Sequence, residues 1–286
     1  MKEPEKGTIG LGCMRLSTAV DRDDVRSIAV IHAALDAGVT LLDTADAYCL
    51  DDSEANHNER LIATALASWQ GDRSAIEVAT KGGMRRPGGK WAPQGRAKHL
   101  REACLTSMQA LGVDAIDLYQ LHVVDPKTAL ETSVRALAAL QAEGKIRRIG
   151  LCNVNVGQIV SARSIAAIDS VQVSMSVLDS ENLHNGVAEY CRDEGIRLIA
   201  YRPLGGARAS RLARDPVLAE VSARRGVTPH EIALAWLMDL GVVPIPGATR
   251  EETARSAGEA LRVRLTEVDR GVLDERFSGR LLRVPR

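Results

Sequence analysis

Eight short β-type segments alternate with longer helical patterns along the 286 residues, and this alternation predicts an α/β protein folded as a single (β/α)8 TIM barrel. No shift in composition divides the chain, so one domain over residues 1–286 is expected. Two long segments without a regular pattern, 82–97 and 204–215, follow the third and seventh expected strands. Because all strands of such a barrel end on one face, both long loops are expected on that face.

The expected elements follow one another in regular order. Strands are expected at 8–13, 40–44, 75–80, 115–121, 147–152, 170–174, 197–202 and 242–246. Helices are expected at about 22–38, 57–69, 98–112, 127–143, 156–166, 183–194, 228–240 and 251–260. Asp21 is expected to cap the first helix, and Gly38 to end it in the left-handed conformation.

Charge and cysteine usage narrow the class of protein. Lys+Arg and Asp+Glu both total 37, so no net field would attract nucleic acid or an acidic membrane surface, and neither partner is expected. The five cysteines are odd in number and lack CxxC spacing, which indicates reduced thiols in a cytoplasmic protein. No segment approaches the roughly 18 apolar residues of a membrane helix. The sequence therefore predicts a soluble intracellular protein.

Four polar residues stand where expected strands end, which is the part of a barrel where sites are built: Asp43, Tyr48, Lys81 and His122. Singly, such residues are more often turn, solvated or core residues than catalysts. Together the case is stronger, because Lys81 and Asp43 leave neighbouring strands and would face a common pocket. We therefore expect Asp43 to hold Lys81 charged and directed toward Tyr48.

A tyrosine has a pKa near 10, which is too high for efficient proton donation at neutral pH unless its anion is stabilised. A lysine cation at ~4 Å and an effective dielectric constant of ~20 attracts a phenolate by about 4 kcal/mol, or roughly 3 pKa units. Burial acts in the opposite direction, so a smaller net lowering is expected. Tyr48 would then give a proton to a developing alkoxide, while His122 orients the carbonyl oxygen. No GxSxG or Ser-His pair supplies a nucleophile, which leaves hydride as a candidate.

The chain resembles an aldo-keto reductase over essentially its whole length. The resemblance is carried by DTADAY at 43–48, NERLI at 58–62, ATKGG at 79–83, LGVDAIDLYQLH at 111–122, IRRIGLCNV at 146–154, AYRPLGG at 200–206 and PIPGATR at 244–250. It implies a barrel enzyme that reduces aldehydes or ketones with NADPH/NADP+ as cofactor. Asp43, Tyr48, Lys81 and His122 match the catalytic tetrad of that family.

The resemblance also implies a set of cofactor contacts. Asn153 and Gln172 would bind the nicotinamide carboxamide, Tyr201 would stack on the ring, and Gly12, Cys13 and Met14 would approach the nicotinamide ribose. The phosphates would lie along Arg202, Leu204 and Gly205 and at Gly247 and Thr249, where loop N–H groups enter the last helix. Arg250 and Arg255 are the candidates for the 2′-phosphate, with a solvated helix face as the other interpretation.

Three positions depart from the family pattern. Cys152, which would contact the carboxamide more weakly than a hydroxyl, and Arg202 stand where serine is usual, and Ala257 replaces a polar group near the adenine. The loop after Tyr48 carries Cys49, Asp51, Asp52, Glu54 and His57, whose spacing matches no known metal site, so no metal is expected. Trp91 is expected to form an aromatic wall of the substrate pocket, although a tryptophan packed on its own loop would give the same pattern.

Two other functions stay open at this stage. The same fold also serves as a redox-sensing or regulatory subunit that binds NADPH and turns over slowly. An unrelated barrel enzyme would use Lys81 as a Schiff-base nucleophile, which requires a lowered lysine pKa, whereas Asp43 would raise it. The physiological substrate, beyond a small carbonyl compound, and the oligomeric state cannot be deduced from the sequence.

Overall fold

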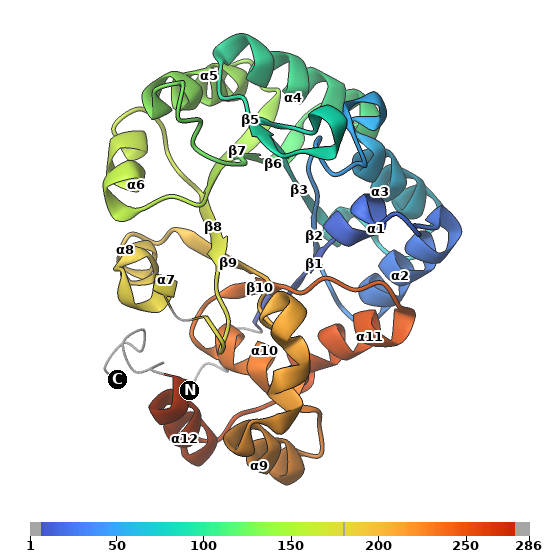
Figure 1. Cartoon of the computed structure of the whole chain (residues 1–286), viewed down its shortest axis with the longest axis vertical. Coiled ribbons are helices and arrows are strands. Elements are labelled where there is room, and N and C mark those ends of the chain that lie inside the picture. Colours follow the sequence, from blue (N-terminus) through green and yellow to red (C-terminus); the bar gives the residue numbers. More distant parts are fainter. Residues whose placement is uncertain (1–6, 180, 278–286) are drawn as a thin grey trace.

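The computed structural model describes residues 7–179 and 181–277, and its eight parallel strands form one sheet that curls into a nearly closed barrel (Figure 1). The strands are β1 (Gly10–Gly12), β2 (Leu41–Asp43), β3 (Glu77–Gly82), β6 (Ile116–Leu121), β7 (Ile146–Cys152), β8 (Ser170–Ser174), β9 (Arg197–Tyr201) and β10 (Val243–Ile245). A parallel bridge between Gly12 and Gly247 joins β1 to the segment directly after β10. The (β/α)8 fold predicted from the sequence is confirmed.

Helices surround this sheet in the expected order (Figure 1). They are α2 (Asp24–Asp36), α3 (His57–Ser68), α4 (Ala97–Leu111), α5 (Leu130–Ala142), α6 (Val156–Arg163), α7 (Glu181–His184), α8 (Val187–Asp193), α10 (Pro229–Asp239) and α11 (Glu251–Glu259). The prediction of a single helix at 183–194 is wrong, because Gly186 takes a left-handed conformation with φ of 84° and separates α7 from α8. None of the described helices is long and apolar enough to cross a membrane.

Several described elements were not expected from the sequence. Three are the helices α1 (Met14–Thr18), α9 (Pro216–Arg225) and α12 (Glu267–Phe277). The segment 82–97 is not irregular, because β4 (Met84–Arg85) and β5 (Ala92–Pro93) pair as an antiparallel hairpin. The segment 204–215 contains a 3₁₀ helix, Gly206–Arg214.

The cap expected for the first long helix is also corrected. Asp23, not Asp21, is the N-cap of α2, and its side chain accepts a hydrogen bond of 2.8 Å from the backbone N–H of Arg26. Its extended backbone, with φ of −141°, is the conformation that an N-cap requires. The other end agrees with the prediction, since Gly38 follows α2 with φ of 97°.

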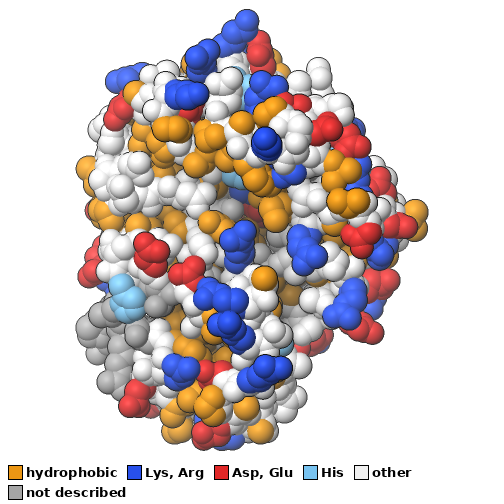
Figure 2. Space-filling view, viewed as in Figure 1, with side chains coloured by type: hydrophobic (Ala, Val, Ile, Leu, Met, Phe, Trp, Pro, Cys, Tyr) orange, Lys and Arg blue, Asp and Glu red, His pale blue; other side chains and the backbone are white. Residues whose placement is uncertain are grey.

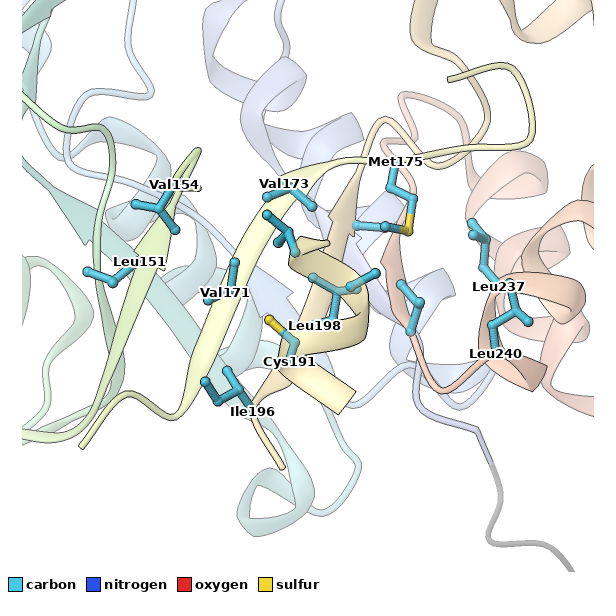
Figure 3. Packing of buried hydrophobic residues seen from close by; sticks show 14 of the residues in the cluster. Leu151, Val154, Val171, Val173, Met175, Cys191, Ile196, Leu198, Leu237 and Leu240 are labelled. Carbon is cyan, nitrogen blue, oxygen red and sulfur yellow. The ribbon is translucent and has the colours of Figure 1, made fainter. Parts of the chain in front are cut away.

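Most of the apolar core lies between the sheet and the helices, as in the packing of β7, β8 and β9 against α8 and α10 (Figure 3). A smaller cluster is made up of Leu41, Ala79, Leu118, Ile199, Val243 and Ile245. Two residues further along the same strands stand Asp43, Lys81 and Gln120, which are all buried. Because residues two apart in a strand point to the same side, these polar side chains share the barrel interior with that cluster, nearer the carboxyl ends of the strands.

Candidate active site

The ammonium group of Lys81 lies at the centre of the polar layer and uses all three of its N–H groups. Nζ donates to Asp43 Oδ2 at 2.7 Å, to the carbonyl oxygen of Thr44 at 2.8 Å and to Tyr48 Oη at 3.0 Å. The Lys81 side chain is 1% exposed. Burial lowers the pKa of this lysine, but the Asp43 carboxylate, with a smaller contribution from Tyr48, raises it more, so its net pKa is raised. Lys81 is therefore a fixed cation.

Asp43 ends β2 and is held on both of its oxygens. Oδ2 accepts from Lys81, and Oδ1 accepts from Gln172 Nε2 at 2.7 Å and from Gln120 Nε2 at 3.4 Å. Removal of a buried carboxylate from water is costly unless its oxygens find donors, and these three donors replace the water. The arrangement fixes the orientation of the carboxylate that holds Lys81.

Tyr48 lies in the loop after β2, and its hydroxyl oxygen accepts from Lys81. The expected net lowering of the Tyr48 pKa is wrong. Burial raises the pKa more than Lys81 lowers it, and Asp43 offsets part of the lysine's field, so the net pKa is raised. The phenol is therefore fully protonated at neutral pH.

His122 follows β6 directly and stands edge-to-face with Tyr48, with ring centroids 5.6 Å apart. Burial and the nearby Lys81 lower its pKa to about 3, so the imidazole is neutral at pH 7. Its Nδ1 is buried without a hydrogen-bond partner. A neutral imidazole donates from one nitrogen only, and Nε2 is the nitrogen left to donate to a ligand.

Trp91, carried by the β4–β5 hairpin, completes an aromatic group. Its ring centroid lies 6.4 Å from that of Tyr48 and 6.1 Å from that of His122. The guanidinium of Arg86, which is 9% exposed, stacks over Trp91 at 4.0 Å. The structure thus brings Trp91 to the same place as the four strand-end residues.

Residues predicted to contact the nicotinamide group lie at the ends of β7, β8 and β9. The Tyr201 hydroxyl donates to Asn153 Oδ1 at 2.9 Å, and Asn153 Nδ2 donates to the carbonyl oxygen of His122 at 3.4 Å. A cavity of about 320 Å³ opens beside these two residues and is also lined by Ser174, Gln158 and Asn182. Gln172 lies deeper and donates to Asp43.

The two cysteines predicted to contact the cofactor point into the protein. Cys13 is buried, and its Sγ donates to the carbonyl oxygen of Leu11 at 3.5 Å. Cys152 Sγ donates to Gln120 Oε1 at 3.7 Å, so its single S–H is used inside the barrel. Gly12 and Met14 flank Cys13 and are partly exposed. A side chain on Gly12 would meet the carbonyl oxygen of Ile245 at 3.0 Å, so the backbones of β1 and β10 approach closely there.

The residues predicted to contact phosphate are spread over two loops. Arg202 and Gly205 have positive φ values of 51° and 81°, and Leu204 lies between them. Gly247, Thr249 and Arg250 precede α11, whose N-terminus lacks a side-chain cap. Figure 2 shows a hollow near the centre of the viewed face, with Lys and Arg side chains beside it.

The two arginine candidates for the 2′-phosphate differ in their surroundings. Arg255 forms an ion pair of 2.9 Å with Glu251, whereas Arg250 has no ion-pair partner among the described residues. Ala257 is 5% exposed and packs in the core, so it offers no polar group to a ligand.

The charged loop after Tyr48 uses its side chains to hold itself in place. Asp51 accepts from the N–H of Ser53, Asp52 pairs with Arg85 at 2.5 Å, and Glu54 pairs with Arg22 at 2.7 Å. His57 Nδ1 lies 2.9 Å from Ser17 Oγ. The charged side chains of this loop therefore bind other parts of the protein and stabilise the loop.

Sequence reasoning missed Gln120, although it lies in the centre of this site. The signal was present, since Gln120 stands two residues before His122 in an expected strand and must therefore face the same side. Arg86 was missed as well, because no sequence pattern predicts that the β4–β5 hairpin brings Arg86 over the Trp91 ring.

The fold defines this protein as a (β/α)8 barrel with polar side chains grouped at the carboxyl ends of its strands. The chain matches the model of the aldo/keto reductase family over residues 8–275 and belongs to this family. An uncharacterized oxidoreductase of Schizosaccharomyces pombe, C215.11c, is 33% identical over 261 residues, which cover 87% of this chain and 81% of that protein.

Solved structures give the same result. The thermostable aldo-keto reductase Tm1743, in complex with the inhibitor epalrestat, is 27% identical with a TM-score of 0.80 and 94% coverage of both chains. An aldo-keto reductase from Klebsiella pneumoniae in complex with NADPH is 24% identical with a TM-score of 0.77, over 94% of this chain and 90% of that one. At this identity, the second likeness supports the fold alone.

Proposed function

We propose that this protein reduces an aldehyde or ketone to an alcohol, with NADPH as the hydride source and Tyr48 as the proton donor. One observation carries the proposal: Lys81 Nζ donates to Tyr48 Oη at 3.0 Å. Because the phenolic oxygen accepts this bond, the phenolic O–H remains free to donate outward to a substrate oxygen. Asp43, Lys81 and His122 complete the proposed catalytic set.

The proposed chemistry divides the work between the four side chains. His122, neutral at pH 7, donates from Nε2 to the carbonyl oxygen and orients it. NADPH supplies a hydride to the carbonyl carbon when it is bound. As negative charge develops on the oxygen, Tyr48 transfers its proton to that oxygen, and the nearby ammonium of Lys81 stabilises the phenolate that remains. Trp91 forms one wall of the substrate pocket in this proposal.

The residues present fit a nicotinamide dinucleotide. The cavity beside Tyr201 and Asn153 offers an aromatic face and an amide, and the N-terminus of α11 has N–H groups without a side-chain cap. Membership of the aldo/keto reductase family favours NADPH as that dinucleotide. We assign Arg250 rather than Arg255 to the 2′-phosphate, because Arg255 already pairs with Glu251, whereas Arg250 has no ion-pair partner among the described residues.

The remaining proposed cofactor contacts lie at the end of β1 and in the two loops that follow β9 and precede α11. Gly12, Cys13 and Met14 would face the nicotinamide ribose, Cys13 through its backbone only. Arg202, Leu204 and Gly205, with Gly247 and Thr249, would surround the phosphates. In this proposal the Cys152 thiol contacts Gln120 and not the cofactor. The five buried free cysteines support a reducing, cytoplasmic location for a single-domain protein that acts on a small molecule.

A slowly turning redox-sensing subunit is the alternative on the same fold. Stopped-flow oxidation of bound NADPH by an excess of aldehyde separates the two functions, because an enzyme completes many rapid turnovers and a sensor completes one slow turnover. The Schiff-base mechanism is disfavoured by the fixed charge of Lys81, since a nucleophilic amine must be neutral.

A panel of aldehydes, ketones and hydroxylated carbonyl compounds, followed by NADPH absorbance, tests the proposed function. Tyr48→Phe is the matched variant, because it removes the donated proton and leaves the ring that contacts Trp91 and His122. We expect turnover with at least one substrate and a loss of roughly 10³-fold or more in Tyr48→Phe, in the range of general acid catalysis. Equal rates in both proteins would refute the assignment of Tyr48.

A further inference from the structure

Gln120 occupies a position that the proposed reaction does not yet explain. It is fully buried on β6, and its Cα is in register with Lys81 of β3 on one side and Gly150 of β7 on the other. Burying a primary amide is unfavourable unless its groups find hydrogen-bond partners. Gln120 does find them, and all three belong to the proposed site.

The amide of Gln120 contacts three of the proposed site residues. Its Nε2 donates to Asp43 Oδ1 at 3.4 Å. Its Oε1 accepts from Gln172 Nε2 at 3.3 Å and from Cys152 Sγ at 3.7 Å. One side chain thus touches the carboxylate that holds Lys81 and both inward-facing groups at the ends of β7 and β8.

Chemistry fixes which end of each amide points where. A carboxylate that receives the Lys81 ammonium can only accept hydrogen bonds, so the atom of Gln172 that lies 2.7 Å from Asp43 Oδ1 must be its nitrogen. The second N–H of that nitrogen is taken by Gln120 Oε1. Both hydrogens of Gln172 Nε2 are therefore used inside the barrel, and only its Oε1 is left to meet a ligand.

The neighbouring strand leaves room for this arrangement. A Cβ on Gly150 would stand 2.7 Å from Gln120 Cγ and 2.5 Å from Ser170 Oγ, closer than real contacts allow. Glycine at this position of β7 therefore provides the space that the Gln120 side chain needs.

We propose that Gln120 is a positioning residue that occupies the second N–H of Gln172, whose amide orientation Asp43 sets, so that Gln172 presents only its oxygen to the NH2 group of the nicotinamide carboxamide. The inference rests on the proposed function. Asn153 complements it: Oδ1 already accepts from Tyr201, which leaves an N–H of Nδ2 for the carboxamide oxygen. Gln120 thereby determines which donors and acceptors the site offers without touching the cofactor itself.

A cofactor analogue tests this directly without measuring turnover. NADP+ and its 3-acetylpyridine analogue differ in that a methyl group replaces the carboxamide NH2. Dissociation constants for both are measured by quenching of tryptophan fluorescence in the parent, in Gln120→Met and in Leu118→Met. Leu118→Met is the matched control, because Leu118 lies two residues earlier on β6 in the apolar cluster and makes no polar contact with the site.

We expect the parent and Leu118→Met to prefer NADP+ by about five-fold, the contribution of one ordinary hydrogen bond. In Gln120→Met the second N–H of Gln172 is released, and the preference should fall below about two-fold. In Gln120→Glu the buried carboxyl group is protonated beside Asp43, donates to it and keeps an oxygen for Gln172, so the preference should return toward the parent value. If Gln120→Met does not fold, Gln120→Leu takes its place and should show the same loss of preference.

The possible failures are distinguishable. An unchanged preference in Gln120→Met, in a protein that binds NADP+ and reduces a carbonyl substrate, would overturn the positioning role and leave the proposed function intact. A parent that binds neither dinucleotide would overturn both. A parent that binds both dinucleotides equally would overturn the assignment of the Gln172 oxygen to the carboxamide.

Discussion

Replacement of Lys81 by methionine removes the cation that contacts Tyr48 and keeps a side chain of similar length. At the observed Nζ to Oη distance of 3.0 Å and an effective dielectric constant of about 20, one positive charge stabilises a full phenolate by about 5.5 kcal/mol. A transition state in which about half of that charge has developed loses about 2.8 kcal/mol, which lowers kcat roughly 100-fold. A fully developed phenolate sets the upper limit at roughly 10⁴-fold.

The assay must separate this effect from damage to the fold. Lys81→Met leaves the Asp43 carboxylate buried without its cation, which destabilises a protein by about 3–5 kcal/mol. The double variant Asp43→Asn with Lys81→Met removes both charges, so we expect it to recover most of the unfolding free energy in urea and none of the lost kcat. A double variant that also recovers kcat, or a folded Lys81→Met with kcat within threefold of the parent, would refute the electrostatic role of Lys81.

Three further predictions follow from particular side chains. Asp23→Ala should destabilise the protein by about 1 kcal/mol in urea unfolding, because it removes the cap of α2, whereas Asp21→Ala should change stability by less than about 0.5 kcal/mol; equal effects would contradict the assigned cap. Since the pKa of His122 is about 3 when folded and about 6.5 when unfolded, the unfolded chain binds the extra proton between these values. Stability should then fall by about 2 kcal/mol more between pH 7.5 and pH 5 in the parent than in His122→Asn, and identical pH dependences would count against the lowered pKa. Arg250→Ala should reduce the ratio of KM for NADH to KM for NADPH by about tenfold or more and Arg255→Ala should leave it nearly unchanged, in line with the strength of a charge-assisted hydrogen bond; the reverse order would show that Arg255 binds the 2′-phosphate.

The strand ends could be predicted because their signals are local. Each strand of the barrel is a short apolar run, and Asp43, Lys81 and His122 stand at or beside the ends of such runs. The start of α9 also had a local signal, because Asp215 caps it and Pro216 occupies its first position. No helix was expected between the irregular segment 204–215 and the helix at 228–240.

Other features depend on distances that the sequence does not contain. The pKa of Tyr48 is raised by burial and lowered by the Lys81 cation, whose effect Asp43 partly cancels. The direction of the net shift therefore could not be derived from residue types. The hydrogen bonds that connect Gln120, Gln172 and Asp43 join residues up to 129 positions apart. The stacking of Arg86 on Trp91 likewise requires the β4–β5 hairpin, and the sequence contains no periodic pattern that predicts this hairpin.

The solvent isotope effect on a single turnover tests the central claim most directly. NADPH bound to an excess of enzyme is mixed with a saturating aldehyde in H2O and in D2O, and its oxidation is followed by stopped flow for the parent and for Tyr48→Phe. If Tyr48 gives its proton as the carbonyl is reduced, the parent reacts more slowly in D2O, and Tyr48→Phe is slowed by orders of magnitude. A Tyr48→Phe protein that oxidises NADPH as fast as the parent, with the same isotope effect, would contradict the claim.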